Sequence, residues 1–334
     1  MPILERSTYQ PPSWWVSGGH LQTIIPALFR KVVSSPYKRE RITTPDGDFL
    51  DCDWLYAANK ASSRKLAVIS HGLESNSLRP NVIGMARAFS LCGYDALAWN
   101  FRGCSGEPNR LARAYHSGAT EDLYAVLEHV VVHYDEIYLI GFSLGANLTL
   151  KYLGEQRHSL SPKIKKAVVF SVPCDLAASS TQISRFSNRL YERRFLKSLR
   201  QKIEQKATLF PNEISLEPYL KKQIKTLRDF DDCYTAPLHG FQNADDYYAK
   251  CSSKPLIASI TIPTLIINAK NDVFLPASCY PFEEAKASDV VFLETPESGG
   301  HLGFLTEAQS HGLYWSEMRA LGFIESRDEV AKNG

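Results

Sequence analysis

The sequence predicts an α/β protein in which helices flank a mostly parallel central sheet. Between residues 65 and 173, short apolar runs typical of buried strands alternate with helical patterns. This alternation indicates βαβ units, whose strands run parallel. The alternation stops at residue 174 and resumes near residue 261. We therefore expect residues 174–258, termed the insertion, to form a helical cap after the sixth strand, over the carboxyl edge where α/β sheets bind ligands.

The strands begin with a predicted hairpin over residues 39–55. Asp46-Gly47 lies there between two alternating runs, which is a strong turn signal. The remaining strands are expected at 65–70, 94–101, 136–140, 166–173, 261–268 and 290–294.

Helices are expected between these strands. One has Pro80 near its first turn and Gly93 past its end. A last helix is predicted over 304–322. Another shows a single apolar face made by Leu123, Val126, Leu127, Val130 and Val131.

The length of 334 residues is enough for one large α/β domain, and we expect a single domain over residues 1–334 that contains the insertion. Residues 1–36 have little periodicity. They are interpreted as an N-terminal arm that docks Trp14 and Trp15 onto the body.

Composition excludes several classes of function. Hydrophobic content of 44% and charged content of 22% are ordinary for a globular protein, and a net charge of +2 gives no reason to expect a nucleic-acid partner. No apolar run reaches the roughly 18 residues that span a bilayer, and the first residues lack the apolar region of a signal peptide. The seven cysteines are scattered and form no Cys-x-x-Cys, so we expect free thiols in a reducing cytoplasm.

The segment Gly141-Phe142-Ser143-Leu144-Gly145 has the form Gly-x-Ser-x-Gly. An apolar run precedes it and a helical pattern follows it. This strand–turn–helix context is that of a nucleophile elbow, in which two glycines permit a very tight turn and the serine hydroxyl is exposed. Ser143 is therefore the candidate nucleophile.

A serine nucleophile needs a histidine base that a carboxylate orients. Four histidines follow Ser143 in the chain, and only His301 follows a strand within a glycine-rich loop. We favour His301 over the others, which are His158 in a polar loop, His239 in the insertion and His311 in a helical pattern.

The acid has two candidates. Asp272 follows the strand after the insertion, and Asp175 follows the strand before it. Asp175 also has the sequence position of a helix N-cap, which is a structural role. We favour Asp272.

Backbone donors for an oxyanion are expected at two positions. One is the N–H of Leu144, directly after the nucleophile, and the other is the N–H of Leu73 in the loop after the third strand. His71, Gly72 and Phe142 flank these donors and are expected to contact the substrate.

Other chemistry is disfavoured. No histidine pair or Cys/His cluster has metal spacing, so we expect no metal and no cofactor. Cys104 has no evident base, and its loop lacks the Gly-Lys-Ser/Thr end of a P-loop.

From Arg185 to Lys206 there are eight basic and two acidic residues, with an apolar stripe. This stretch could contact an anionic membrane surface weakly, although we favour a solvated face that packs on the core.

Several segments together are distinctive: Gly19–Thr23, Asn100–Gly106, Tyr115–Gly118, Gly141–Gly145 and, in the insertion, Phe230–Asp232, Gly240-Phe241 and Asp246–Tyr248. Over nearly its full length the chain resembles the YheT-like family of α/β-hydrolases, related to eukaryotic ABHD-type lipases and yeast medium-chain ester synthases. The resemblance implies an α/β-hydrolase fold, a Ser143–Asp272–His301 triad and ester substrates with an acyl chain.

The expected function is hydrolysis of short- or medium-chain acyl esters through an acyl-enzyme. Two alternatives stay open: an alcohol acyltransferase that uses the same acyl-enzyme, and a non-catalytic binding module. The acyl chain length, the alcohol moiety and the oligomeric state are not defined by the sequence.

Overall fold

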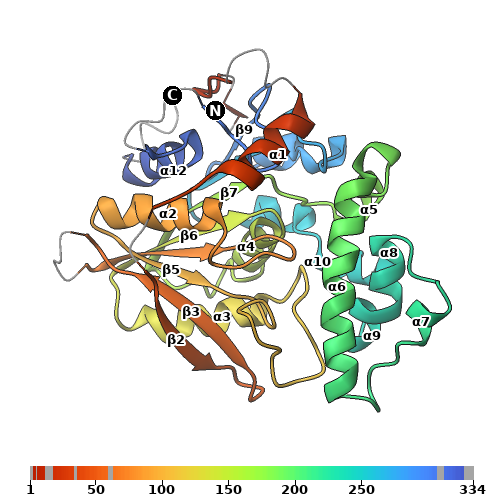
Figure 1. The fold of residues 1–334 in the computed structure, drawn as a ribbon. Coiled ribbons are helices and arrows are strands. Elements are labelled where there is room, and N and C mark those ends of the chain that lie inside the picture. The colour runs from red at the N-terminus through yellow and green to blue at the C-terminus, as the bar shows by residue number, and fades with distance from the viewer. Residues whose placement is uncertain are drawn as a thin grey trace.

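The computed structural model describes residues 3–4, 6–11, 18–33, 36–58, 63–306 and 312–326. Trp14, Trp15 and His311 lie outside the described residues. The described strands form one nine-stranded sheet in the order β1-β9-β8-β7-β6-β4-β5-β3-β2 (Figure 1). The strands are β1 (Ile3–Leu4), β2 (Lys38–Thr43), β3 (Phe49–Leu55), β4 (Lys65–Ser70), β5 (Asp95–Trp99), β6 (Glu136–Phe142), β7 (Ile164–Phe170), β8 (Thr264–Ile267) and β9 (Val291–Glu294).

The predicted mostly parallel sheet is confirmed. All neighbouring strands pair in parallel except β2 with β3 and β3 with β5, which form the antiparallel edge. The β2–β3 hairpin turns at Gly47, whose φ of 82° favours glycine. β1 was not expected from the sequence. Because it precedes the hairpin, the strand before the insertion is the seventh in the structure rather than the sixth.

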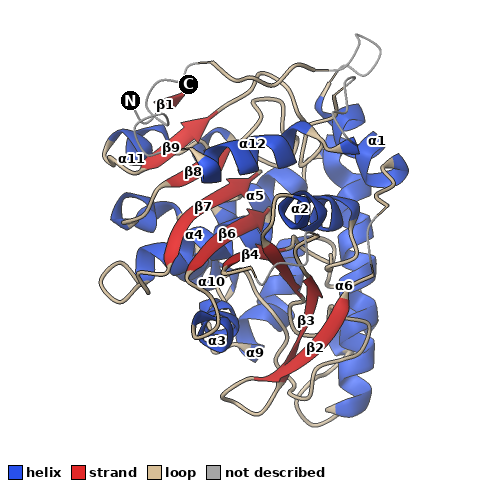
Figure 2. Ribbon diagram, turned by 90° about the vertical axis from the view of Figure 1, so that its left-hand side faces the viewer, coloured by secondary structure: helices blue, strands red, loops and turns tan. Residues whose placement is uncertain are grey.

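Helices cover both faces of the sheet (Figure 2). α2 (Pro80–Leu91) and α12 (Trp315–Glu325) pack on one face, and α3 (Thr120–Val131) and α4 (Leu144–Glu155) on the other. Alternate residues of β4 serve the two cores: Leu66 and Val68 pack with α3 and α4, whereas Ala67 and Ile69 pack with α2. This alternation is the expected consequence of the two-residue repeat of a strand.

The insertion is helical and contains no strand, as the sequence predicts. Its own apolar core joins Leu199, Ile203, Leu227 and Phe230 to Ala112 of the loop after β5. The helices are α5 (Leu176–Ile183), α6 (Arg189–Leu209), α7 (Glu217–Leu220), α8 (Leu227–Phe230), α9 (Ala236–Leu238) and α10 (Ala244–Cys251), with a π-helical turn at Asp231–Thr235. Short 3-10 turns lie at Phe186–Asn188, Lys254–Ser259 and Ala277–Cys279, and α11 (Phe282–Lys286) precedes β9.

One prediction near the C-terminus needs correction, and the segment near the N-terminus contains regular structure. The closing helix begins at Trp315 rather than at 304, because Phe304 has a φ of 39° and Gly312 a φ of 73°, neither of which continues a helix. Within residues 1–36 the structure contains a helix, α1 (Gly19–Phe29), as well as β1. Neither element was expected from the sequence, and the docking of Trp14 and Trp15 stays a prediction because both lie outside the described residues.

Candidate active site

Ser143 lies in a strained turn between β6 and α4. Its φ of 51° and ψ of −115° place a residue with a side chain in a conformation that such residues rarely adopt. Strain of this kind costs about 1–3 kcal/mol and persists only where the surroundings enforce it. The Ser143 N–H donates to the Phe170 carbonyl at 2.9 Å, which ties the turn to the neighbouring strand β7.

The two glycines of the motif leave no room for a side chain. A Cβ on Gly145 would lie 2.4 Å from the carbonyl oxygen of His71, and one on Gly141 would lie 2.7 Å from Cα of Ala146. Both contacts are with backbone atoms that cannot swing away. The Gly-x-Ser-x-Gly pattern is therefore required by close packing of α4 against β4 and β6.

Ser143, His301 and Asp272 form one hydrogen-bonded chain. The Ser143 Oγ lies 3.0 Å from His301 Nε2. On the other side of the ring, His301 Nδ1 lies 2.9 and 3.0 Å from the two carboxylate oxygens of Asp272. Since an ionised carboxylate only accepts, the geometry requires a proton on Nδ1 and leaves Nε2 free to accept from the serine hydroxyl.

The other acid and base candidates have different partners. Asp175 accepts a hydrogen bond from the Ala178 N–H at 3.1 Å and thus N-caps α5. The ring of His239 lies between the carbonyl oxygens of Thr235 and Ala114, at 2.7 and 2.9 Å. His158 is exposed and contacts its neighbour Arg157.

The loop after β4 passes directly beside the serine. A Cβ on Gly72 would lie 3.3 Å from Cβ of Ser143. Among the described residues, neither the Leu73 N–H nor the Leu144 N–H has a hydrogen-bond acceptor. Leu144 is the first residue of α4, where N–H groups have no partner within the helix. Both N–H groups are therefore available to a ligand.

His71 and Phe142 were expected to contact the substrate, but both side chains are buried in the body of the protein. His71 is fully buried, accepts a hydrogen bond from the Phe101 N–H at Nε2 and donates from Nδ1 to the Gly72 carbonyl. Burial lowers its pKa to about 3, which keeps the ring neutral. Phe142 stacks on Phe170 in the core. Of the three expected contact residues, only Gly72 lines the cavity described below.

α1 supports the loop of His301, a role that was not expected from the sequence. The Thr23 Oγ1 accepts a hydrogen bond from the His301 N–H at 2.8 Å. The Gln22 Oε1 accepts from the Gly299 N–H at 2.8 Å and from the Asn271 side chain at 2.9 Å. These contacts join the loops that carry His301 and Asp272. The only signal in the sequence was the distinctive segment Gly19–Thr23.

Glu74 connects the loop after β4 to the insertion. It follows Leu73, has a φ of 48°, and its carboxylate accepts from the Tyr115 hydroxyl at 2.6 Å. From α6, the Lys202 ammonium donates to the same carboxylate at 2.9 Å, and the Ser198 hydroxyl also donates to it. The insertion is thus bonded directly to the residue beside the Leu73 N–H.

A cavity of about 450 Å³ opens at Ser143. The body of the protein contributes Leu73, Leu144 and His301 to its wall, and the insertion contributes apolar side chains. Among those of the insertion are Leu176, Ile183, Phe195, Leu199, Leu227 and Phe230. A concave, largely apolar site with a few polar groups at one place is typical of small-molecule sites.

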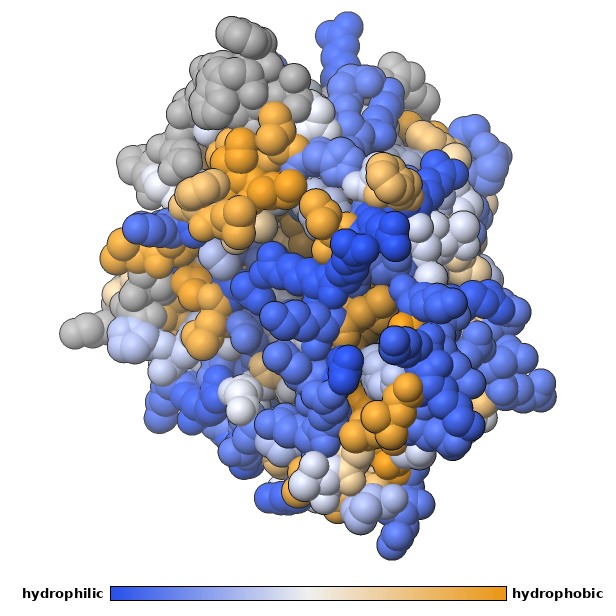
Figure 3. All heavy atoms as spheres, turned by 45° about the vertical axis from the view of Figure 1, so that its right-hand side comes forward, coloured by the Kyte–Doolittle hydropathy of each residue, from blue (hydrophilic) through white to orange (hydrophobic). Residues whose placement is uncertain are grey.

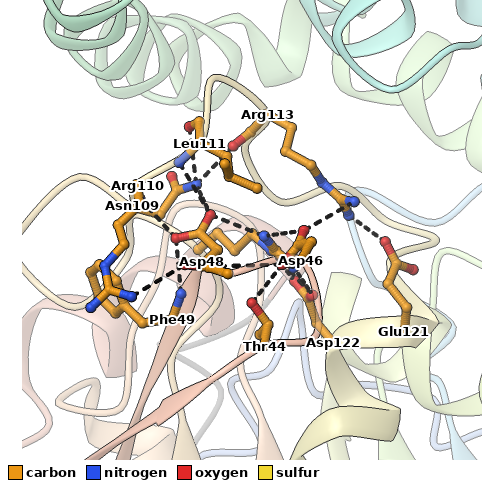
Figure 4. Close-up of polar contacts among 12 residues, drawn as sticks. Thr44, Asp46, Asp48, Phe49, Asn109, Arg110, Leu111, Arg113, Glu121 and Asp122 are labelled. Atoms are coloured by element: carbon orange, nitrogen blue, oxygen red, sulfur yellow. Dashed lines mark hydrogen bonds and ion pairs between the residues drawn. The ribbon is translucent and has the colours of Figure 1, made fainter.

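A buried ionic cluster holds the loop after β5 under α6. The Arg102 guanidinium bonds to the carboxylates of Asp46, Asp48 and Asp122, and Figure 4 shows these carboxylates converging from the hairpin turn and the start of α3. Lys206 of α6 donates to the carbonyl of Leu111 in the same loop, and burial lowers its pKa to about 8. The cluster fixes one wall of the cavity.

Neither a metal site nor a membrane-spanning helix is found among the described residues. No group of three or more His, Cys, Asp or Glu side chains there could hold a metal ion. No helix in that part of the chain has both the length and the apolar character needed to cross a membrane. The Cys104 thiol is buried, which raises its pKa to about 11, so it is a poor nucleophile.

The fold and this site define an α/β-hydrolase. The family model described as alpha/beta hydrolase fold matches residues 68–308, and the chain therefore belongs to that family. Solved structures agree on the fold: an esterase of Pyrococcus furiosus, Pf2001, superposes with a TM-score of 0.57 at 18% identity, covering 89% of this chain and 95% of that one.

Within the family the chain is YheT-like. It is 35% identical to YheT of Escherichia coli K12 over 305 residues, which cover 91% of this chain and 89% of that protein. It is also 33% identical to phospholipase ABHD3 of Mus musculus over 307 residues, covering 89% and 73% of the two chains. The resemblance inferred from the sequence is confirmed, and the protein is an esterase/lipase-like hydrolase.

Proposed function

We propose that the protein hydrolyses carboxylic esters through a Ser143–His301–Asp272 triad. Ser143 Oγ attacks the ester carbonyl carbon while His301 Nε2 takes its proton, and Asp272 stabilises the imidazolium that forms. The same proton then passes to the leaving alcohol. Water then loses a proton to His301 Nε2 and attacks the acyl carbon. The bond from the acyl carbon to Ser143 Oγ breaks, His301 returns the proton to Oγ, and the carboxylic acid leaves.

The negative charge on the carbonyl oxygen would be stabilised by the N–H groups of Leu73 and Leu144. Such donors are already oriented before the reaction, and removing one from a protease cost about 10²–10³ in turnover. The observation that carries the proposal is the 3.0 Å contact between Ser143 Oγ and His301 Nε2 at the floor of the cavity.

The proposed substrates are esters of short- or medium-chain acids. Apolar walls favour an acyl chain, and each methylene buried there contributes about 0.8 kcal/mol, or roughly fourfold in binding. Two relatives are named for lipid esters, a phospholipase and a monoacylglycerol lipase. We also propose a reducing compartment such as the cytoplasm, because all seven cysteines are free.

The test is hydrolysis of p-nitrophenyl esters of rising chain length. The specificity constant should rise a few-fold per carbon until the cavity is full and then fall. Ser143→Ala should lose all turnover above background, whereas the matched control Ser159→Ala, an exposed position, should behave as the wild type. Hydrolysis that persists in Ser143→Ala would refute the proposal, and a new ester formed in preference to the acid when alcohol is added would point to an acyltransferase.

A further inference from the structure

The outer face of α6 and the turn before it carry a row of free cations. Of the eight basic residues between Arg185 and Lys206, Lys202 and Lys206 turn inward and Arg200 pairs with Glu204. The other five are exposed, and none has an ion pair with any carboxylate in the described part of the chain: Arg185, Arg189, Arg193, Arg194 and Lys197. Glu192, the acid among them, is buried. This face therefore has a strong, uncompensated positive charge.

Large apolar side chains are exposed next to these cations. Phe186 in the 3-10 turn before α6 and Leu190 at the start of α6 are 89% and 77% exposed. Leu28 and Phe29, at the end of α1, are 60% and 71% exposed. Figure 3 shows orange side chains gathered on the upper part of this face, with strongly hydrophilic side chains directly beside them. Contiguous exposed apolar surface on a folded protein marks an interaction site more often than chance.

The two helices meet at the opening of the cavity. His20 of α1 stacks on Tyr191 of α6, with ring centroids 5.8 Å apart. Leu28 and Arg194 are exposed to solvent and also line the cavity, so they lie at its rim. This surface thus contributes one apolar and one cationic residue to the rim of the cavity that holds Ser143.

We propose that this surface docks on an anionic lipid bilayer and presents the cavity entrance to the lipid. Exposed aromatic and aliphatic side chains that flank a row of arginines and lysines are the features that bind a helix to the interface of such a bilayer. This inference rests on the proposed ester hydrolysis for its purpose, but the surface is defined independently of Ser143. A bilayer fits better than an acidic protein because the apolar residues require a partner that is itself apolar beneath its charges.

The test measures binding of the protein to lipid vesicles by co-sedimentation. One kind of vesicle is pure phosphatidylcholine, and the other also contains 30% phosphatidylglycerol. Wild type should bind the anionic vesicles at least tenfold more tightly, and salt should weaken this binding. Each basic residue near an anionic surface contributes about fivefold. Arg189→Glu with Arg193→Glu should therefore lose about 25-fold or more. The matched control is Arg157→Glu with Lys165→Glu, equal in charge and near the opposite, amino end of β7, and it should lose little.

The contribution of the exposed apolar side chains is tested by the double variant Phe29→Ser with Phe186→Ser. This variant should bind both kinds of vesicle more weakly at any salt concentration. Neither the α6 pair, Arg189 and Arg193, nor the apolar pair, Phe29 and Phe186, lines the cavity. Hydrolysis of a soluble short ester should therefore be unchanged in all of them, which separates a failure of docking from a failure of catalysis. Equal binding to neutral and anionic vesicles, or equal losses in the α6 pair and its control, would overturn the proposal.

Discussion

The Thr23 hydroxyl accepts a hydrogen bond from the backbone N–H of His301 at 2.8 Å. This contact sets the position of the loop that carries the imidazole. Thr23→Val keeps the shape of the side chain and removes the acceptor. We expect kcat to fall about tenfold with KM nearly unchanged, because a shift of about 1 Å in a reacting group can cost up to a hundredfold.

The matched control is Thr181→Val, which removes an exposed threonine hydroxyl on α5. Steady-state kinetics with one soluble ester, together with a thermal unfolding midpoint for each variant, makes the comparison. A change in midpoint with no change in kcat would mean that Thr23 serves stability alone.

Lys202 and Glu74 provide a second, separate link, from α6 to the loop of Leu73. Lys202→Met should release the Glu74 carboxylate and loosen the Leu73 N–H, so we expect kcat to fall about tenfold or more. Lys197→Met on the exposed face of the same helix should have no effect. If the two variants have equal kcat, the link does not influence the chemistry.

The acid is tested by Asp272→Asn. Without a carboxylate at Nδ1 the ring is no longer held in the required tautomer, and the loss in kcat should be about 10³–10⁴. Asp175→Asn keeps an N-capping side chain for α5 and should change kcat only slightly. A larger loss in Asp175→Asn than in Asp272→Asn would reverse the assignment of the acid.

Buried His71 predicts a specific pH dependence of stability. Its pKa in the folded protein is lowered from 6.5 to about 3 by burial. Between these two values the unfolded chain binds a proton that the folded protein does not, so this residue makes the free energy of unfolding rise with pH. The contribution is at most about 1.4 kcal/mol per pH unit.

Urea unfolding of wild type and His71→Asn at pH 4.5, 5.5 and 6.5 measures this effect. The variant should be less stable at pH 6.5, yet its stability should change less with pH. Parallel pH profiles would show that His71 is not the group responsible.

The sheet was predictable because its signals are local. The β2–β3 hairpin follows from Asp46-Gly47, and each parallel strand is a short apolar run with helical patterns around it. The meeting of Ser143, Asp272 and His301 was also predictable, since all three follow strands that end at the same edge of the sheet.

The remaining features depend on contacts between distant segments. Thr23 and His301 are 278 positions apart, and α1 contains Pro26, so its sequence does not read as a helix. The sequence of α6 predicts an amphipathic helix, but it does not say which of its cations turn inward to Glu74. The two-residue strand β1 is too short to produce a pattern at all.

Labelling with a fluorophosphonate tests whether Ser143 is the nucleophile. The probe reacts with an activated serine, and tandem mass spectrometry locates the adduct. We expect one adduct, on Ser143, which is absent in Ser143→Ala and formed much more slowly in His301→Ala. An adduct on another residue, or labelling that persists unchanged in Ser143→Ala, would contradict it.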